Sequence, residues 1–451
     1  MRHIPYSRLY ASLGLALFAT ASAQAQSSQQ VVKPPKMVLW MDASTGTMAG
    51  MPDMDIPGVG GLMGMMGSLG GKGNADAKTT SKSYYGGARG FGIAPPRILD
   101  IAFWNSLKPG VEAAQRVPSG LKLGDKLPLL PILPEKISQG LGPGEEYRPE
   151  DKDKPKGRFL FYWGCSTTVR PGQPRIIDLS KMTADNAQVM GQAFNGRFAP
   201  DRGARVAAGY DVFPNERDQR SVPKGGSLVG EHQVSGDSVP DSFKFTLGAA
   251  QDIMPPIELQ SQGGLKDSVA LSWGAVPNAK GYFLHAMGGQ GDDMIFWASS
   301  DVPDTGFGMF DFLANGTIDK WIKDKVLLAP AVTQCAVPKG IFGPKEGVAS
   351  KGREDAGAML RMIAYGGEHS FVHPPRPTDV KVAWEQEWAV RLRLKTQTMA
   401  MLGENMMSER GGSGAAASGK GSEAPTKPAD NNPLNALPVP DAVNLIKGLF
   451  K

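Results

Sequence analysis

The chain has 451 residues, with 49 Lys and Arg against 44 Asp and Glu, so its formal net charge is +5. Loss of Arg2 and Arg8 with the leader described below would reduce this to +3, that is, +5 minus 2. So small a surplus, with no stripe of Lys and Arg, excludes a protein that binds nucleic acid by charge. The 57 Gly and 36 Pro exceed average usage and favour short strands joined by turns over a helical protein.

Residues 1–25 have the pattern of a cleavable secretory signal peptide. Two arginines precede an apolar stretch at residues 9–19, and small side chains fit cleavage after Ala23 or Ala25. The apolar stretch is shorter than the roughly 20 residues that span a bilayer, which argues against an uncleaved anchor. We therefore expect a periplasmic or secreted protein. It would not be a lipoprotein, because no cysteine lies near the cleavage site.

A flexible arm rich in Gly and Met is predicted over residues 26–83, with one short strand at residues 37–40. Within it, Met48, Met51 and Met54 are spaced three apart. Thioether sulfur is a soft ligand that selects Cu(I), so these residues are a candidate metal site. Three further methionines could replace one of them: Met63, Met65 and Met66. The competing interpretation is a flexible tract that binds no cofactor.

Residues 84–252 are predicted to form the first of two antiparallel β-sandwich domains. Alternating apolar and polar residues indicate strands at residues 97–104, 158–163, 174–179, 227–234 and 242–247. The Pro/Leu-rich stretch at residues 127–134 is not expected to form a central strand, because proline lacks the N–H of a ladder hydrogen bond. Residues 182–198 could hold one helix.

Residues 255–300 resemble a fibronectin type III module. Residues 256–260 match its first strand, residues 267–273 its second strand ending in Trp273, and residues 276–284 its next turn and strand, which contains Tyr282. The resemblance implies an immunoglobulin-like sandwich over residues 253–400 that acts as a scaffold and not as a catalyst. The whole chain also resembles an uncharacterised family of secreted proteobacterial proteins, which implies no particular activity.

Three further elements are predicted in this second domain. Residues 315–328 have apolar side chains at helical spacing and predict an inserted helix. Residues 358–373 suggest a closing hairpin that turns at Gly366 and Gly367. Residues 388–395 form a strand that would bury its apolar side chains and turn Arg391, Arg393 and Lys395 outward.

The chain has two cysteines, Cys165 and Cys335. An even number of cysteines in an exported protein favours one disulfide, which would tie the two predicted domains together. The alternative is two separate buried thiols, because a sequence does not show which residues are close in space.

The end of the chain is predicted to be a tether and a short contact segment. Residues 401–432 have the composition of a flexible linker, and residues 433–451 follow as a short amphipathic segment. The part from Asp441 to Lys451 is too short to be a stable helix alone, so it would dock on a membrane surface or in a partner's groove. The alternative is a frayed tail.

Other candidate chemistry is weakly supported. His369 and His373 share a face, but no third metal ligand is identifiable, and the tripeptide Asp304-Thr305-Gly306 follows a Pro-containing turn. We therefore expect a non-catalytic binding or structural protein of the cell envelope, whose partner is a protein or another envelope component. Two alternatives stay open: a periplasmic Cu(I)-binding protein, and a carbohydrate-active hydrolase with a site that motifs do not reveal. The sequence leaves the ligand and the oligomeric state open.

Overall fold

The computed structural model describes residues 30–50, 85–89, 96–132, 157–181, 197–200, 202–309, 311–343 and 357–403. Within these ranges the fold is all-β, as predicted, with one α-helix, α3 (Asn315–Lys323). No helix in the same ranges is long and apolar enough to cross a membrane. The predicted signal peptide, Met51, Met54, nearly all of the helix at residues 182–198 and the segment at residues 433–451 lie outside the described residues.

Thirteen strands form one large sheet in the order β10-β9-β4-β5-β8-β3-β2-β18-β16-β13-β14-β6-β7. A three-stranded sheet has the order β11-β12-β15, and β1 pairs with β17. In chain order the strands are β1 (Val32–Lys33), β2 (Met37–Met48), β3 (Arg97–Asn105), β4 (Ala113–Arg116), β5 (Lys126–Pro131), β6 (Arg158–Trp163), β7 (Arg175–Asp178), β8 (Tyr210–Phe213), β9 (Gly230–Gly236), β10 (Lys244–Leu247), β11 (Leu259–Gln262), β12 (Val269–Trp273), β13 (Gly281–Gln290), β14 (Asp293–Ala298), β15 (Gln334–Val337), β16 (Ala358–His373), β17 (Trp384–Glu385) and β18 (Trp388–Leu402).

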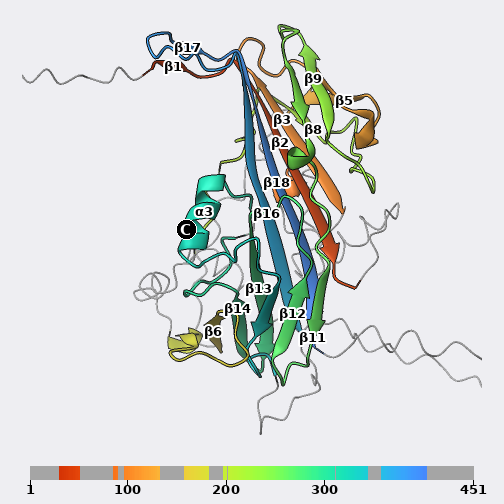
Figure 1. Cartoon of the computed structure of the whole chain (residues 1–451). Coiled ribbons are helices and arrows are strands. Elements are labelled where there is room, and N and C mark those ends of the chain that lie inside the picture. The colour runs from red at the N-terminus through yellow and green to blue at the C-terminus, as the bar shows by residue number, and fades with distance from the viewer. Residues whose placement is uncertain are drawn as a thin grey trace, which may run out of the picture.

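Three long strands form the middle of the large sheet and run along the molecule side by side (Figure 1). β16 has 16 residues, β18 has 15 and β2 has 12. β18 is antiparallel to β16 and parallel to β2, so the first long strand of the chain lies beside the last.

The main core lies on one side of these long strands, which we call the first face. Alternate residues of the long strands and of their neighbours β3 and β13 point to this face, including Leu39, Ile101, Leu284 and Leu392. Apolar side chains of β4, β9 and β10 cover one end of this face, and those of β11, β12 and β15 cover the other. Figure 1 shows β9 beside the upper end of the sheet and β11 with β12 beside the lower end.

The ranges that the sequence separates into two domains share this one large sheet. Strands β3 to β10 come from residues 84–252, while β13, β14, β16 and all but the last two residues of β18 come from residues 253–400. The two ranges can share one sheet because β16 and β18 are long enough to pack against both covering layers. No break in hydrogen bonding separates the two ranges.

Three sequence-based expectations need correction here. The predicted arm contains β2, which extends well beyond the short strand expected at residues 37–40. Its alternate residues Met37, Leu39 and Met41 are buried in the main core. The Pro/Leu-rich stretch does form a strand, β5, whose Leu127 and Leu129 are buried. The start of the predicted linker belongs to β18, which ends at Leu402.

The predicted hairpin at residues 358–373 is one continuous strand with a β-bulge. The register against β18 shifts between Tyr365 and Gly367. Gly367 has a φ of +84°, and a Cβ there would lie 2.1 Å from Oδ1 of Asn315 in α3. The bulge thus requires glycine and lets the helix approach closely.

The predicted inserted helix is present as α3, but it ends at Lys323 and not at residue 328. It packs on the opposite side of the sheet, the second face. Its buried residues Ile318 and Trp321 contact Ile363 and Tyr365 of β16. Asn315 fixes the helix start, because its amide donates a hydrogen bond to Glu368 O at 2.8 Å and accepts one from Glu368 N at 3.0 Å.

Candidate functional sites

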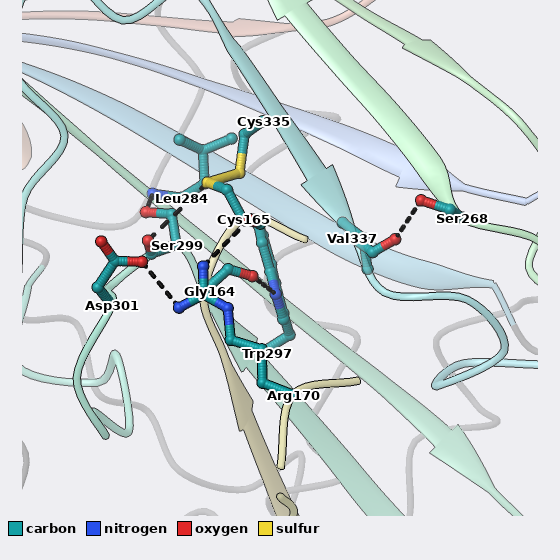
Figure 2. The surroundings of a disulfide bond; sticks show 10 residues. All are labelled: Gly164, Cys165, Arg170, Ser268, Leu284, Trp297, Ser299, Asp301, Cys335 and Val337. Atoms are coloured by element: carbon teal, nitrogen blue, oxygen red, sulfur yellow. Dashed lines mark hydrogen bonds and ion pairs between the residues drawn. A yellow bond between two sulfur atoms is a disulfide. The ribbon is translucent and has the colours of Figure 1, made fainter. Parts of the chain in front are cut away.

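Cys165 and Cys335 form the predicted disulfide, with their Cα atoms 5.0 Å apart (Figure 2). Cys165 follows β6, which belongs to the large sheet, and Cys335 lies in β15 of the small sheet. The bond therefore joins the two sheets. A formed disulfide is consistent with an exported protein, because oxidising compartments lie outside the cytoplasm.

The peptide around Cys165 is held on both sides (Figure 2). The indole N–H of Trp297 donates to Gly164 O at 3.1 Å, and Arg170 donates to Cys165 O at 3.1 Å and to Asp301 Oδ1 at 2.9 Å. Trp297 is fully buried. These hydrogen bonds hold the peptide around Cys165 against the large sheet, and they do so whether or not the disulfide is formed.

The most unusual feature of the second face is a set of buried charges. The pairing of strands places Asp100 of β3 opposite Asp42 of β2, and Asp42 opposite Arg393 of β18. Arg393 forms a two-pronged ion pair with Asp42, with Nε 2.6 Å from Oδ1. Lys395, two residues along β18, is completely buried.

Burial shifts the ionisation of this set in opposite directions. It raises the pKa of Asp100 to about 7, an effect that the neighbouring Asp42 carboxylate reinforces. It lowers the pKa of Lys395 to about 7, with Arg361 repelling the same charge. Both results follow from the cost of placing a charge in a medium of low polarity.

Two segments cover these charges, residues 85–89 and residues 311–312. The backbone N–H of Ala88 donates to Asp100 Oδ2 at 2.7 Å, and Arg89 forms an ion pair with Asp311. The neighbouring ring of Phe312 lies 4.7 Å from the guanidinium carbon of Arg393 and 4.6 Å from Nζ of Lys395. Asp42 and Asp100 are each 1% exposed. A polysaccharide therefore cannot reach this carboxylate pair in the structure.

The outward orientation predicted for two basic residues of β18 is wrong. Only Arg391 is exposed, whereas Arg393 and Lys395 are buried on the second face. Their alternation with apolar residues is as predicted. The prediction fails because the second face is also covered, by residues 85–89, residues around 311 and α3.

A second buried carboxylate, Asp211 of β8, lies apart from this set. It is 0% exposed, and neither of its oxygens has a hydrogen-bond partner among the described residues. Burial raises its pKa to about 7, and the charge of Glu112 adds to the shift. Such a group destabilises the fold when it ionises.

Replacing Asp211 by asparagine is expected to flatten the dependence of stability on pH. The folded-state pKa lies above the unfolded value of about 3.9, so wild-type stability falls as pH rises from 4 to 7 and stays low above that. Asp211→Asn should therefore gain about 1–3 kcal/mol over wild type at pH 8, and much less at pH 4. Urea unfolding at both pH values measures this. Parallel pH curves would contradict it, and Asp237→Asn, at an exposed carboxylate, serves as the control.

The other sequence candidates have structural roles. His373 stacks on Trp388 at 5.2 Å between ring centroids, whereas Nδ1 of His232 accepts a hydrogen bond from the amide Nε2 of Gln115 at 3.0 Å. In the turn at residues 304–306, Asp304 accepts hydrogen bonds from the N–H of Gly306 and from Arg197. Within the described ranges, no three His, Cys, Asp or Glu residues are grouped as metal ligands.

Met48 is the one member of the predicted methionine site within the described residues. It ends β2, half-buried, and its register partner is Met399 of β18. The N–H of Ala49 donates to Met399 O at 2.7 Å, which fixes the two strands side by side. The structure therefore pairs Met48 with a methionine 351 residues away that the sequence did not suggest.

No family model, curated protein or solved structure matches the chain.

Proposed function

We propose that this chain is an exported, non-catalytic binding or structural protein that attaches to the anionic surface of an envelope membrane. The attachment would use an exposed projection made by residues 30–33 and 374–385, which we call the valine tip. Cleavage of the signal peptide after Ala23 or Ala25 would leave the mature chain starting a few residues before this tip. The exposed valines described next are the observation that carries the proposal.

The valine tip is an ordered part of the fold. The side chain of Gln30, 8% exposed, donates to Val382 O at 2.9 Å and accepts from Arg376 Nε at 2.6 Å. The N–H of Trp384 donates to Val31 O at 2.8 Å. β1 and β17 project from one end of the molecule (Figure 1). An ordered projection can present side chains to a partner at little entropic cost.

Four of its valines are about half exposed or more: Val31 at 62%, Val32 at 49%, Val380 at 50% and Val382 at 51%. Exposed apolar groups gathered in one place mark interaction surfaces. Four exposed cations surround them, Lys33, Lys36, Arg376 and Lys381, against two exposed carboxylates, Asp379 and Glu385. Apolar side chains within a basic rim suit an anionic bilayer surface, which gains from both kinds of contact.

The mature protein is expected to bind vesicles that contain phosphatidylglycerol, and Val380→Ser/Val382→Ser is expected to bind them at least fivefold more weakly. Added salt should weaken both proteins' binding, and vesicles of phosphatidylcholine alone should bind weakly. Co-sedimentation with vesicles measures the binding, on protein purified from the exported fraction. The intact mass of this protein reports where the signal peptide is cleaved. Ile176→Ser/Val229→Ser, at exposed apolar residues outside the tip, is the matched control. Equal binding by the tip variant and the control would overturn the proposal, as would capture of a protein partner without lipid.

We also propose that residues 253–402 form a fibronectin type III-like sandwich built into the larger sheet. Support comes from the division of its strands. β11, β12 and β15 form the small sheet, and β14, β13, β16 and β18 are consecutive in the large one. Trp273 of β12 and Tyr282 of β13 meet between them, with ring centroids 5.6 Å apart. Two sandwich-like halves would then share long strands.

A further inference from the structure

The second face carries methionines at the end opposite the valine tip. Alternate residues share a face, so the methionines of β18 at positions 399 and 401 lie with the buried charges and not with the main core. The same alternation places methionines of β2, β13 and β16 there. Five such residues form what we call the methionine strip: Met48, Met287, Met359, Met399 and Met401.

The strand register makes members of the strip direct neighbours. Met287 of β13 is opposite Met359 of β16, and Met359 is opposite Met401 of β18. On the other side of β18, Met399 is opposite Met48. Opposed residues on one face have Cβ atoms roughly 4.5–5.5 Å apart. Two sulfurs on one metal ion, each bonded at roughly 2.3 Å as in zinc sites, lie about 4 Å apart. Flexible thioethers can cover that small difference. Met399 is two residues from Met401 on β18 and diagonal to Met359, at roughly 7–8 Å, a distance that long side chains still span.

The strip is within reach of solvent. Met401 is 46% exposed, and the other four are half-buried. An ion could therefore enter without disruption of the main core, and the neighbouring apolar groups would exclude much of the water around it.

We propose that the methionine strip binds Cu(I) through the thioether sulfurs of Met359, Met399 and Met401, with Met48 or Met287 able to replace one of them. Thioether is a soft, uncharged ligand that selects Cu(I) over harder ions. Arg361 lies opposite Met399 and repels a divalent ion twice as strongly as a monovalent one. The site therefore favours Cu(I) over Cu(II) and Zn(II). The binding does not rest on Met51 or Met54, and it is independent of the valine tip.

Thioethers take up no proton between pH 5 and 8, so affinity should vary little over that range. Lys395, four residues from Met399 on the same face, has a pKa of about 7, and the loss of its charge should raise the affinity slightly as pH rises. A site of histidines or cysteines would instead weaken as pH falls, because its ligands must lose protons to bind. This pH profile separates the methionine strip from a site of histidines or cysteines, and the variants described next separate it from the predicted trio Met48, Met51 and Met54.

The test is titration of the mature protein with Cu(I), supplied without thiol reductants, against a competing chelator. Met359→Leu/Met399→Leu/Met401→Leu is expected to lose at least tenfold in affinity, since leucine keeps the volume and removes the sulfur. Met362→Leu, on the first face of β16, and Met51→Leu/Met54→Leu are expected to bind as wild type does. Methyl NMR signals of the strip methionines should shift with the redox-inert ion Ag(I).

Three results would overturn the proposal. One is the absence of Cu(I) binding by the wild type, and another is equal affinity of the triple variant and the wild type. The third is loss of binding in Met51→Leu/Met54→Leu alone, which would move the site to the predicted trio Met48, Met51 and Met54. Unfolding curves of the triple variant and Met362→Leu separate loss of ligands from loss of fold.

Discussion

Asp42→Ala is expected to lower the free energy of unfolding by about 3–5 kcal/mol, because it leaves the Arg393 guanidinium buried without its carboxylate. Both side chains are 2% exposed, so water cannot replace the lost partner. Below about pH 7, where Lys395 is protonated, its charge adds repulsion, because its Nζ and the Arg393 guanidinium lie over the same ring of Phe312. Urea unfolding of wild type and variant measures the loss.

The double variant Asp42→Ala/Arg393→Met should recover part of this stability, since an uncharged side chain needs no partner in that position. Arg391→Met provides the matched control on the same strand. Arg391 is 44% exposed and lies 3.6 Å from Glu368, so its loss should cost less than about 1 kcal/mol. If Asp42→Ala and Arg391→Met lost similar amounts of stability, the ion pair would not be part of a buried interior.

Removal of the disulfide is expected to have an effect of the same size. The bond joins residues 170 positions apart, and the chain-entropy model gives roughly 5 kcal/mol for a loop of that length. We therefore expect Cys165→Ser/Cys335→Ser to unfold at a much lower urea concentration than the oxidised wild type. The loss would act mainly through the unfolded chain, which gains freedom when the loop is open.

Reduced wild type is the control for this variant, since both lack the crosslink and should unfold at similar urea concentrations. The hydrogen bonds of Arg170 and Trp297 hold the peptide around Cys165 in either state, so the folded structures should have similar spectra. A difference below about 1 kcal/mol between oxidised and reduced protein would contradict the chain-entropy account of this bond.

The sequence predicts individual strands better than their arrangement. β6 has the bounds expected from its apolar and aromatic residues, and β3 differs from expectation by one residue. Short-range patterns of this kind report which side chains are buried along one strand. They contain no signal for β18 pairing with β2, which depends on residues about 350 positions apart. The way in which the two predicted ranges share one large sheet leaves no such signal either.

The candidate sites, too, could be predicted from the sequence only where no long-range pairing of strands was needed. The two cysteines were paired correctly because only one pairing exists. Asp42 gave no signal, since a lone carboxylate next to a short apolar run is typical of a turn or an exposed position. Met399 and Met401 alternate in the sequence as strand residues on one face do. Only the pairing of β18 with β16 and β2 brings them beside Met359 and Met48.

The parallel pairing of β2 with β18 has a consequence for how the chain matures. β2 lies between β3 and β18, so the middle of the large sheet stays open until residues 388–402 have been made. Closing so long a loop is slow, because its entropy must be lost before the contacts form. A chain emerging from the ribosome would therefore remain without its central ladder until residues 388–402 are available. Folding of the large sheet is completed only once β18 pairs with β2 and β16.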